Sequence, residues 1–482
     1  MGTKTSSFKN HMRDGSLQRQ MEWIAPERLF PAFAAKPGFI WLDSGRVMGG
    51  QSRWSFMMWS PEQVIGGRVG EFYHAVGDLP QRPIIDPFET LRDILSFGEA
   101  RLPHDGYLEE TGVPPFTGGA AGFFGYGLQT LTEPSTRLAG KAPSAEGDIW
   151  VGIYGAVAAF DQLKGELTLA TSVKDSENPA VALDRMEEEI LQAEAVTSNR
   201  SESVSSDSGK RNLVKSNFTR EGFMTAVERV RSYIEQGDCY QANIAQRFFA
   251  EDTMDDTLYL KLREINPAPF GAYINTGAAR ILSVSPERFI RLRGDMAETM
   301  PVKGTRPRGR LPMEDNLLKL ELFDSEKDRA ENVMIVDLLR NDFSKVCLPH
   351  SVAAPDICRL EEHPTVFHLV STVVGRLRPG LGPLDLLKSA FPGGSVTGAP
   401  KIRAMEIIDE LEPDPRGAYC GAIGYIGYGG GMDTSVTIRT MVRADGKISF
   451  HAGGGITYSS DPSEEYQETL DKARALIEAV SW

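Results

Sequence analysis

The sequence predicts an α+β fold in which large, mixed but mostly antiparallel β-sheets are flanked by helices. Three observations lead to this class. Short apolar runs rich in β-branched and aromatic residues recur along the chain, and helical patterns lie between them. The helices do not alternate strictly with the strands, which argues against a doubly wound parallel sheet. At 482 residues the chain is long enough to bury a large core.

The first half of the chain is expected to form a largely antiparallel sheet region. Its strand-like runs include residues 38–42, 53–57 and 150–154, and helical stretches such as residues 87–98 interrupt them. A glycine-rich run at residues 118–127 lacks the spacing of a phosphate-binding loop. Close packing of backbone against a sheet is therefore its expected role.

Composition divides the chain into four parts. The polar residues 1–15 are expected to be a flexible tail, and the serine-rich residues 195–217 are expected to be a linker or exposed loop. These segments bound an N-terminal region at residues 16–194 and a second region at residues 218–482, which is called the catalytic region because the candidate site residues described below all lie in it.

In the catalytic region, helical patterns and strand-like runs are intermixed. The predicted helices cover residues 219–236, 325–341, 383–390, 400–411 and 462–479. The predicted strands cover residues 240–249, 270–275, 281–303, 420–426, 433–443 and 447–452.

Composition also excludes several classes of protein. The formal net charge of −14 argues against a nucleic-acid-binding protein, because neutralising phosphates requires a basic surface. The four cysteines form no CxxC pair and are too few for a disulfide framework, as is typical of a reducing compartment. The longest apolar run, residues 149–160, is too short to cross a bilayer, and the start of the chain lacks the apolar stretch of a secretory signal. We therefore expect a cytoplasmic protein that does not bind membranes.

Lys303 is the candidate reactive residue. It lies in a short strand-like run, residues 300–307, which follows a predicted buried strand and contains both Gly and Pro after the lysine. An ordinary lysine has a pKa of about 10.4, so burial or a nearby cation must lower this pKa before the amine attacks carbon. The alternative is a solvated lysine at a strand end.

Two predicted helices each present a pair of acidic residues on one face. Ser325 and Asp328 have the spacing of a helix cap, which leaves Glu331 one turn deeper without a capping role. The last helix repeats this arrangement with Glu465 and Glu468. Paired carboxylates suit Mg²⁺, which takes one or two of them and completes its coordination with water and substrate oxygens. Acidic helix faces that simply face solvent are the alternative.

Two glycine loops, residues 391–401 and 452–457, have backbone suited to binding an anion. Tight turns at the start of a helix are the alternative explanation. Arg439 is a charge inside a predicted strand and is able to bind a carboxylate, although strand arginines often pair with an acid instead. His368 lies among apolar neighbours, where it is either a core residue or a hydrogen-bond donor. No zinc-binding, nucleophilic-serine or catalytic-cysteine pattern occurs.

Several ordered segments resemble the chorismate-utilising enzymes. The matching segments span residues 237–468 in the order of that family, and the N-terminal resemblance is looser. They are residues 237–243, 285–289, 301–305, 330–342, 368–371, 398–406 and 452–456. The resemblance implies the fold of the anthranilate synthase component I family.

Two positions indicate the branch of this family. Isochorismate and salicylate synthases, which add water, carry a lysine base where this chain has Gln241. Anthranilate synthases carry alanine where this chain has Lys303. The resemblance therefore implies amination of chorismate by ammonia to 4-amino-4-deoxychorismate, the precursor of para-aminobenzoate and folate. The alternatives are an anthranilate synthase component I and a regulatory subunit that binds chorismate or tryptophan without turnover.

The resemblance also implies roles for individual residues. Lys303 is expected to add to C2 of chorismate as the C4 hydroxyl leaves, and Glu287 is expected to protonate that hydroxyl. His368 is expected to face the reacting ring. The implied substrate contacts are Gln241, Thr305, Lys401, Tyr419, Arg439, Gly454 and Gly455. The implied Mg²⁺ ligands are Glu331 and Glu468, with Asp328 and Glu465 in supporting positions.

The sequence contains no glutaminase segment, so the resemblance implies that ammonia comes from solution or from a glutamine amidotransferase subunit. Residues 41–44 and 52–55 match the position where anthranilate synthases bind tryptophan as a feedback inhibitor. Asp43 departs from their usual glutamate, so tryptophan binding and a purely structural role both stay open.

Overall fold

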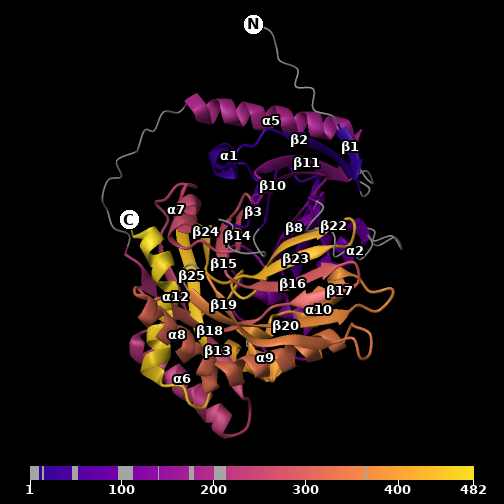
Figure 1. Cartoon of the computed structure of the whole chain (residues 1–482). Coiled ribbons are helices and arrows are strands. Elements are labelled where there is room, and N and C mark those ends of the chain that lie inside the picture. Colours follow the sequence, from indigo (N-terminus) through magenta and orange to yellow (C-terminus); the bar gives the residue numbers. More distant parts are fainter. Residues whose placement is uncertain are drawn as a thin grey trace.

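Two large sheets form the framework of the protein, which is described by a computed structural model (Figure 1). The structure describes residues 10–13, 16–45, 53–95, 112–138, 140–172, 178–199, 213–363 and 366–481. Residues 1–9 and 14–15 of the predicted tail, and residues 200–212 of the predicted linker, lie outside the described residues. Asn10–Arg13, which were predicted to be part of the tail, instead form strand β1, because their backbone pairs with β2 (Ser16–Met21).

The strands of the first sheet follow one another in an order that differs from their order along the chain. In spatial order they are β1, β2, β11 (Glu166–Ser172), β10 (Ala156–Asp161), β4 (Trp54–Met58), β3 (Ile40–Asp43), β14 (Phe270–Asn275), β15 (Arg280–Ser285), β24 (Thr440–Ala444), β25 (Lys447–Ile456), β13 (Gln241–Glu251) and β12 (Lys215–Ser216). The short strand β21 (Gly398–Ala399) also pairs with β13.

The second sheet is built in the same way. In spatial order its strands are β18 (Val302–Pro307), β20 (Val366–Arg376), β17 (Met296–Thr299), β16 (Arg288–Arg293), β23 (Met432–Val436), β22 (Ala422–Gly427), β8 (Gly119–Phe124), β9 (Ile149–Tyr154), β5 (Gln63–Arg68), β6 (Glu71–Val76) and β7 (Arg82–Ile84), and β19 (Ala353–Glu362) also pairs with β20. Every pairing of named strands among the described residues is antiparallel. The predicted α+β class with large antiparallel sheets is therefore confirmed.

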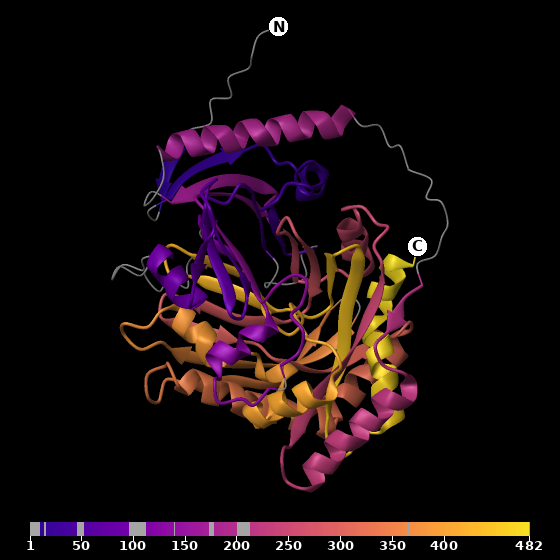
Figure 2. The same cartoon turned by 180° about the vertical axis from the view of Figure 1, so that it is seen from behind.

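The N-terminal and catalytic regions share both sheets. In the first sheet β3 pairs with β14, and in the second sheet β8 pairs with β22. Figure 2 shows the indigo and purple strands of the first region beside the orange and yellow strands of the second. The glycine-rich run of β8 fits the role expected for it, since a side chain at Gly122 would come within 2.1 Å of the Trp150 carbonyl oxygen on β9.

Helices cover the outer faces of the two sheets. Those packed on the first sheet are α1 (Pro26–Phe33), α5 (Pro179–Asn199), α6 (Arg220–Glu235), α7 (Leu258–Ile265) and α12 (Pro462–Val480). Those packed on the second sheet include α2 (Pro87–Leu95), α9 (Glu326–Ser344) and α10 (Pro383–Ala390). Helix α11 (Lys401–Leu411) packs on β13 of the first sheet, and its Met405 also belongs to the apolar core of the second sheet. The remaining helices are α4 (Gln129–Thr132) and α8 (Pro312–Asp324), and 3-10 turns occur at Tyr126–Leu128 and Gly394–Val396. A separate apolar cluster between the sheets joins Phe56 and Met58 of the first sheet to Phe123 and Ile423 of the second.

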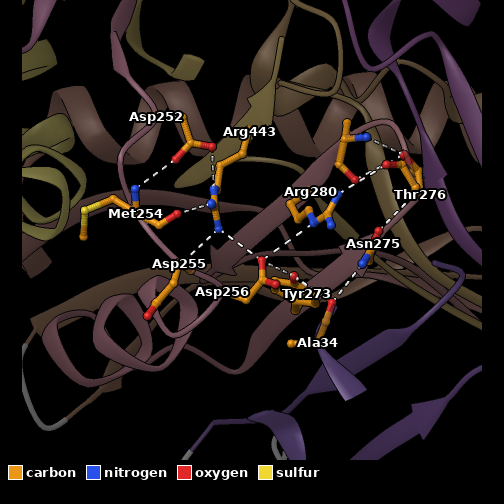
Figure 3. A network of polar contacts seen from close by, with 12 residues as sticks. Ala34, Asp252, Met254, Asp255, Asp256, Tyr273, Asn275, Thr276, Arg280 and Arg443 are labelled. Atoms are coloured by element: carbon orange, nitrogen blue, oxygen red, sulfur yellow. Dashed lines mark hydrogen bonds and ion pairs between the residues drawn. The ribbon is translucent and has the colours of Figure 1, made fainter. Parts of the chain in front are cut away.

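A polar network joins the end of α1 to residues of the catalytic region (Figure 3). Arg443 on β24 donates from Nε to Asp252 at 3.0 Å and from Nη1 to Asp256 at 3.1 Å. Asp256 also accepts a hydrogen bond from the hydroxyl of Tyr273 at 2.8 Å, and this hydroxyl lies 3.0 Å from the carbonyl oxygen of Ala34, just after α1. The network therefore connects β24, the segment before α7, β14 and the end of α1.

Most predicted helices of the catalytic region occur within a few residues of their predicted bounds. Ser325 caps α9, accepting a hydrogen bond from the backbone N–H of Asp328 at 3.2 Å, and Asp461 caps α12. The predicted strand 281–303 is in fact four strands, β15 to β18. The predicted strand 433–443 breaks at Arg439, whose φ of 51° interrupts the extended backbone between β23 and β24.

Helix α8 was not predicted from the sequence. This helix has apolar residues on two faces, since Leu322 is buried while Leu317 and Leu320 are 63% and 55% exposed. A helix with apolar residues on two faces does not show the single-sided period on which a prediction depends. Within the described part of the chain, no helix has the length and apolar character needed to cross a membrane.

Candidate active site

Lys303 is the second residue of β18, and its side chain is half-buried. Its Nζ donates a hydrogen bond to the backbone carbonyl of Ser395 at 3.2 Å. Burial lowers the pKa of Lys303 below its usual value, and the carboxylates of Glu331 and Glu287 offset part of this shift. The amine is therefore neutral more often than a solvated lysine, as a nucleophile requires.

Glu287 lies between β15 and β16, with 6% of its surface exposed. The hydroxyl of Ser395 donates a hydrogen bond to Glu287 Oε1 at 2.8 Å. Burial raises the pKa of Glu287 to about 7, although the Ser395 hydrogen bond and the charge of Lys303 both act in the opposite direction. Near neutral pH this carboxyl is able to give a proton to a leaving group.

Ser395 and Asn243 are polar residues of this centre that the sequence analysis did not select. The Ser395 carbonyl accepts hydrogen bonds from Lys303 and from Asn243 Nδ2, the latter at 2.9 Å. Asn243 Oδ1 in turn accepts from Gln241 Nε2 at 2.9 Å. Gln241, Asn243, Ser395, Lys303 and Glu287 thus form one connected polar group, and three of the five were predicted. Ser395 lies in the glycine loop 391–401, whose backbone was predicted to suit an anion, so this loop was a local signal for it.

His368 and Thr305 face each other on neighbouring strands. The Thr305 hydroxyl lies 2.9 Å from His368 Nδ1, joining β18 to β20. Burial lowers the pKa of His368 to about 4, and the nearby His363 acts in the same direction. His368 is therefore a neutral imidazole at physiological pH, able to donate one hydrogen bond and accept another.

The acidic residues of α9 and α12 lie near Lys303. Burial raises the pKa of Glu331, and the charge of Glu468 adds to this increase, so the two helices present their carboxylates to a common space. A side chain at Gly454 would lie 3.1 Å from Glu465 Oε2 and 3.4 Å from Glu468 Oε1, so these oxygens border the same glycine loop. Glu465 Oε2 is buried and has no hydrogen-bond partner among the described residues. Such an unpaired carboxylate oxygen is suited to a hard cation such as Mg²⁺.

Three of the four predicted metal ligands have polar partners within the protein. Lys472 pairs with Glu468 at 2.5 Å, Arg306 lies 3.3 Å from Asp328, and the Ser460 hydroxyl donates to Glu465 Oε1 at 2.6 Å. Consistently, the described residues contain no group of three or more His, Cys, Asp or Glu side chains already gathered as a metal site. The donor set fits Mg²⁺ by its chemistry, since carboxylate oxygens are the protein ligands that this cation prefers.

Three other predicted substrate residues lie around the glycine loop of β25. Tyr419 stacks on His451, with ring centroids 5.0 Å apart and planes 11° from parallel. Arg439 donates from Nη1 to the backbone carbonyl of Lys472 at 2.6 Å, which directs its guanidinium toward α12. A side chain at Gly455 would come within 2.3 Å of Gln241 Nε2, so glycine allows the Gln241 side chain to lie in its present position.

Lys401 is the predicted site residue that the structure uses elsewhere. Its buried ammonium binds Asp342 on α9 at 2.6 Å and the carbonyl of Ala390 at 2.9 Å. These contacts join the start of α11 to α9 and α10. The geometry gives Lys401 a role in packing the helices around the site.

A separate cavity of about 450 Å³ lies where the sequence suggested an N-terminal pocket. Leu42, Asp43, Ser44 and Trp54 line it, and residues 46–52 of that region lie outside the described residues. Asp43 is already paired with Arg263, whose Nε lies 2.5 Å from the carboxylate. The structure thus contains the pocket and leaves its occupant open.

Comparisons with known proteins agree with this geometry. The family model described as "chorismate binding enzyme" matches residues 65–478. The chain is 41% identical over 396 residues to aminodeoxychorismate synthase component 1 of Escherichia coli K12, covering 82% of this chain and 83% of that protein. It is 38% identical over 454 residues to the protein of the same name from Klebsiella aerogenes, covering 94% and 96% of the two chains. The solved structure of anthranilate synthase component I from Streptococcus pneumoniae TIGR4 aligns with a TM-score of 0.74 at 31% identity, over 88% of this chain and 92% of that one. The chain therefore belongs to the chorismate-binding enzyme family.

Proposed function

We propose that this protein is an aminodeoxychorismate synthase component 1, which converts chorismate and ammonia to 4-amino-4-deoxychorismate and water. The observation that carries the proposal is the pairing of Lys303 and Glu287 through Ser395. An amine with a lowered pKa and a carboxyl with a raised pKa are the nucleophile and the acid that this reaction needs.

The proposed reaction has two displacements. The neutral amine of Lys303 forms a bond to C2 of chorismate, both ring double bonds shift, and the C4 hydroxyl leaves as water with a proton from Glu287. Ammonia then bonds to C4, both double bonds shift back, and the C2–nitrogen bond breaks to release the neutral amine of Lys303. The new C4 ammonium returns a proton to Glu287. This sequence replaces one direct displacement of hydroxide by two allylic steps, each with a better leaving group.

The remaining residues would bind and orient the substrate. Tyr419, Arg439 and the N–H groups of Gly454 and Gly455 would hold a carboxylate of chorismate, and neutral His368 would face the ring. Glu331 and Glu468, with Asp328 and Glu465 beside them, would hold Mg²⁺. The cation would neutralise a substrate carboxylate close to these acidic side chains.

Nitrogen would come from free ammonia or from a glutamine amidotransferase partner, to which the words "component 1" in the relatives' names point. We infer that the protein works in the reducing cytoplasm, since all four cysteines are free thiols.

Product identification tests the proposed function. The purified chain is incubated with chorismate, Mg²⁺ and ammonium at mildly alkaline pH, and the products are separated and identified by mass spectrometry. We expect a product that a 4-amino-4-deoxychorismate lyase converts to para-aminobenzoate. Formation of anthranilate would instead assign the chain to the anthranilate-forming branch, and tight chorismate binding without turnover would indicate a regulatory subunit.

Replacement of Glu468 by glutamine is expected to raise the Mg²⁺ concentration that gives half-maximal activity by roughly tenfold or more. The amide keeps the size of the side chain and removes the charge that attracts the cation. Activity measured across a Mg²⁺ titration gives the shift, and calorimetric titration of Mg²⁺ gives the binding affinity without turnover.

Glu464→Gln is the matched control for this prediction, because Glu464 is an exposed acid in the first turn of the same helix. We expect its Mg²⁺ titration to match that of the original protein. Equal Mg²⁺ affinity of Glu468→Gln and the control would remove Glu468 from the metal site.

A further inference from the structure

We propose that Ser395 is the positioning residue of the reaction, which holds the proton donor Glu287 with its hydroxyl and the nucleophile Lys303 with its carbonyl. This inference rests on the proposed function, because it concerns how that reaction is arranged. Ser395 is 8% exposed and lies in the 3-10 turn Gly394–Val396 between α10 and β21. No other residue has hydrogen bonds to both of these groups in the described part of the structure.

The turn that carries Ser395 is held on several sides. Arg416 Nη1 donates to the carbonyl of Val396 at 2.9 Å, and the backbone N–H of Asn243 donates to the carbonyl of Thr397 at 2.8 Å. Gly394 packs on α9, since a side chain there would come within 2.5 Å of Leu338 Cδ2. The position of Ser395 is therefore determined by the surrounding fold and does not depend on the groups that it orients.

The hydroxyl of Ser395 orients the carboxyl of Glu287. Because the hydroxyl donates to Oε1, that oxygen acts as an acceptor, and the backbone N–H of Val302 is a second donor to the same carboxyl. These two donors hold the carboxyl in the orientation from which it gives its proton to the leaving hydroxyl. The Ser395 hydrogen bond also stabilises the carboxylate that remains after transfer, which a buried site otherwise disfavours.

The carbonyl of Ser395 orients the amine of Lys303. One N–H of the amine donates to this carbonyl, so the lone pair of the neutral amine occupies another tetrahedral direction. Asn243 Nδ2 binds the same carbonyl at 2.9 Å and keeps it in place when Lys303 forms its bond to carbon. Ser395 therefore sets the position of the Glu287 carboxyl relative to the Lys303 amine.

Replacement of Ser395 by alanine tests the hydroxyl alone, because both bonds to the carbonyl remain. We expect kcat to fall roughly tenfold, since a hydrogen bond to a charged group is lost, while KM for chorismate changes by less than about twofold.

The charged or titratable groups that also face Glu287 are Lys303 from β18, Lys472 from α12 and Cys420 before β22, and the variant changes none of them.

The pH profile provides a readout that a purely structural role would not change. The acid form of Glu287 is lost as pH rises through a pKa of about 7, so activity falls on that side. The Ser395 hydrogen bond lowers this pKa, so its removal raises the pKa and moves the falling limb to higher pH. Ser395→Thr keeps the hydroxyl and is expected to restore both the rate and the limb.

Ser389→Ala is the matched control, because among the described residues its hydroxyl binds only the Leu386 carbonyl within α10, at 2.8 Å. We expect its kcat and pH profile to match those of the original protein. The proposal is overturned if Ser395→Ala leaves both kcat and the pH limb unchanged, or if threonine behaves like alanine in a fully folded protein. An infrared titration of the Glu287 carboxyl, identified by subtraction of the Glu287→Gln spectrum, tests the same pKa shift without turnover. This measurement stays informative even if the product turns out to be anthranilate.

Discussion

Replacement of Lys303 by alanine is expected to reduce amination of chorismate by a factor on the order of 10³ or more. The variant removes the amine that forms the bond to C2, so ammonia would have to displace the C4 hydroxyl in a single step. Folding should be little affected, since Ser395 keeps its hydrogen bond to Asn243 and the half-buried side chain is simply shortened. The rate is measured with ammonium at saturating Mg²⁺, and thermal unfolding is followed on the same preparation.

Two further measurements make this prediction specific to the amine. Lys319→Ala removes a partly exposed lysine that pairs with Glu362 on the surface, and its rate should stay within about twofold of the original. A small alkylamine added to Lys303→Ala should recover part of the lost activity, because it fits the space left by the side chain. A Lys303→Ala variant with nearly full activity would disprove the covalent mechanism.

Replacement of Glu412 by alanine is expected to lower the free energy of unfolding by about 3–5 kcal/mol. Glu412 is 4% exposed and makes two hydrogen bonds to the buried guanidinium of Arg416, at 2.6 and 2.9 Å. It also accepts from the backbone N–H of Ala245 at 2.9 Å. The variant therefore leaves a buried cation and a buried N–H without their acceptor. Denaturant unfolding measures the loss.

The location of this ion pair links stability to the site. Arg416 also binds the carbonyl of Val396, which follows Ser395 in the chain, and the carbonyl of Asn243, which belongs to the polar group. Glu412→Leu combined with Arg416→Met should lower the free energy of unfolding less than Glu412→Ala does, because no unpaired charge remains.

Asp337→Ala is the control, because it breaks an exposed pair with Arg340 and should change the free energy of unfolding by about 0.5 kcal/mol or less. A loss below about 1 kcal/mol in Glu412→Ala would show that the pair is not needed.

Local patterns predicted the elements of the fold well where one signal dominated. Ser325 and Asp461 precede helices that begin one residue later, because the capping hydrogen bonds are made within a few residues of sequence. Predictions were wrong where tertiary contacts decided the local structure. Residues 281–303 form four strands: β15 pairs with β24 in the first sheet, β16 pairs with β23 in the second sheet, and β17 and β18 pair with separate parts of β20. Asn10–Arg13 form a strand because they pair with β2.

The candidate site shows the same division. The sequence selected Lys303, Glu287, Gln241 and the carboxylates of the two helices, and their roles stay predictions until they are tested. It did not select Asn243 or Ser395. Lys472, which binds Glu468, had a local signal, since the two residues stand four apart on one helix.

The sequence by itself determined the fold class, the capped helices and the family. These depend on local periodicity and on ordered motifs, which are present in the sequence before any tertiary contact forms. Only the tertiary structure decided that both sheets are shared by the two regions and that Ser395 joins the acid to the amine. The hydrogen bonds of Ser395 reach Lys303 across 92 residues and Glu287 across 108. No local pattern contains a contact of that range, since it exists only when β18, β15 and the turn after α10 are packed together.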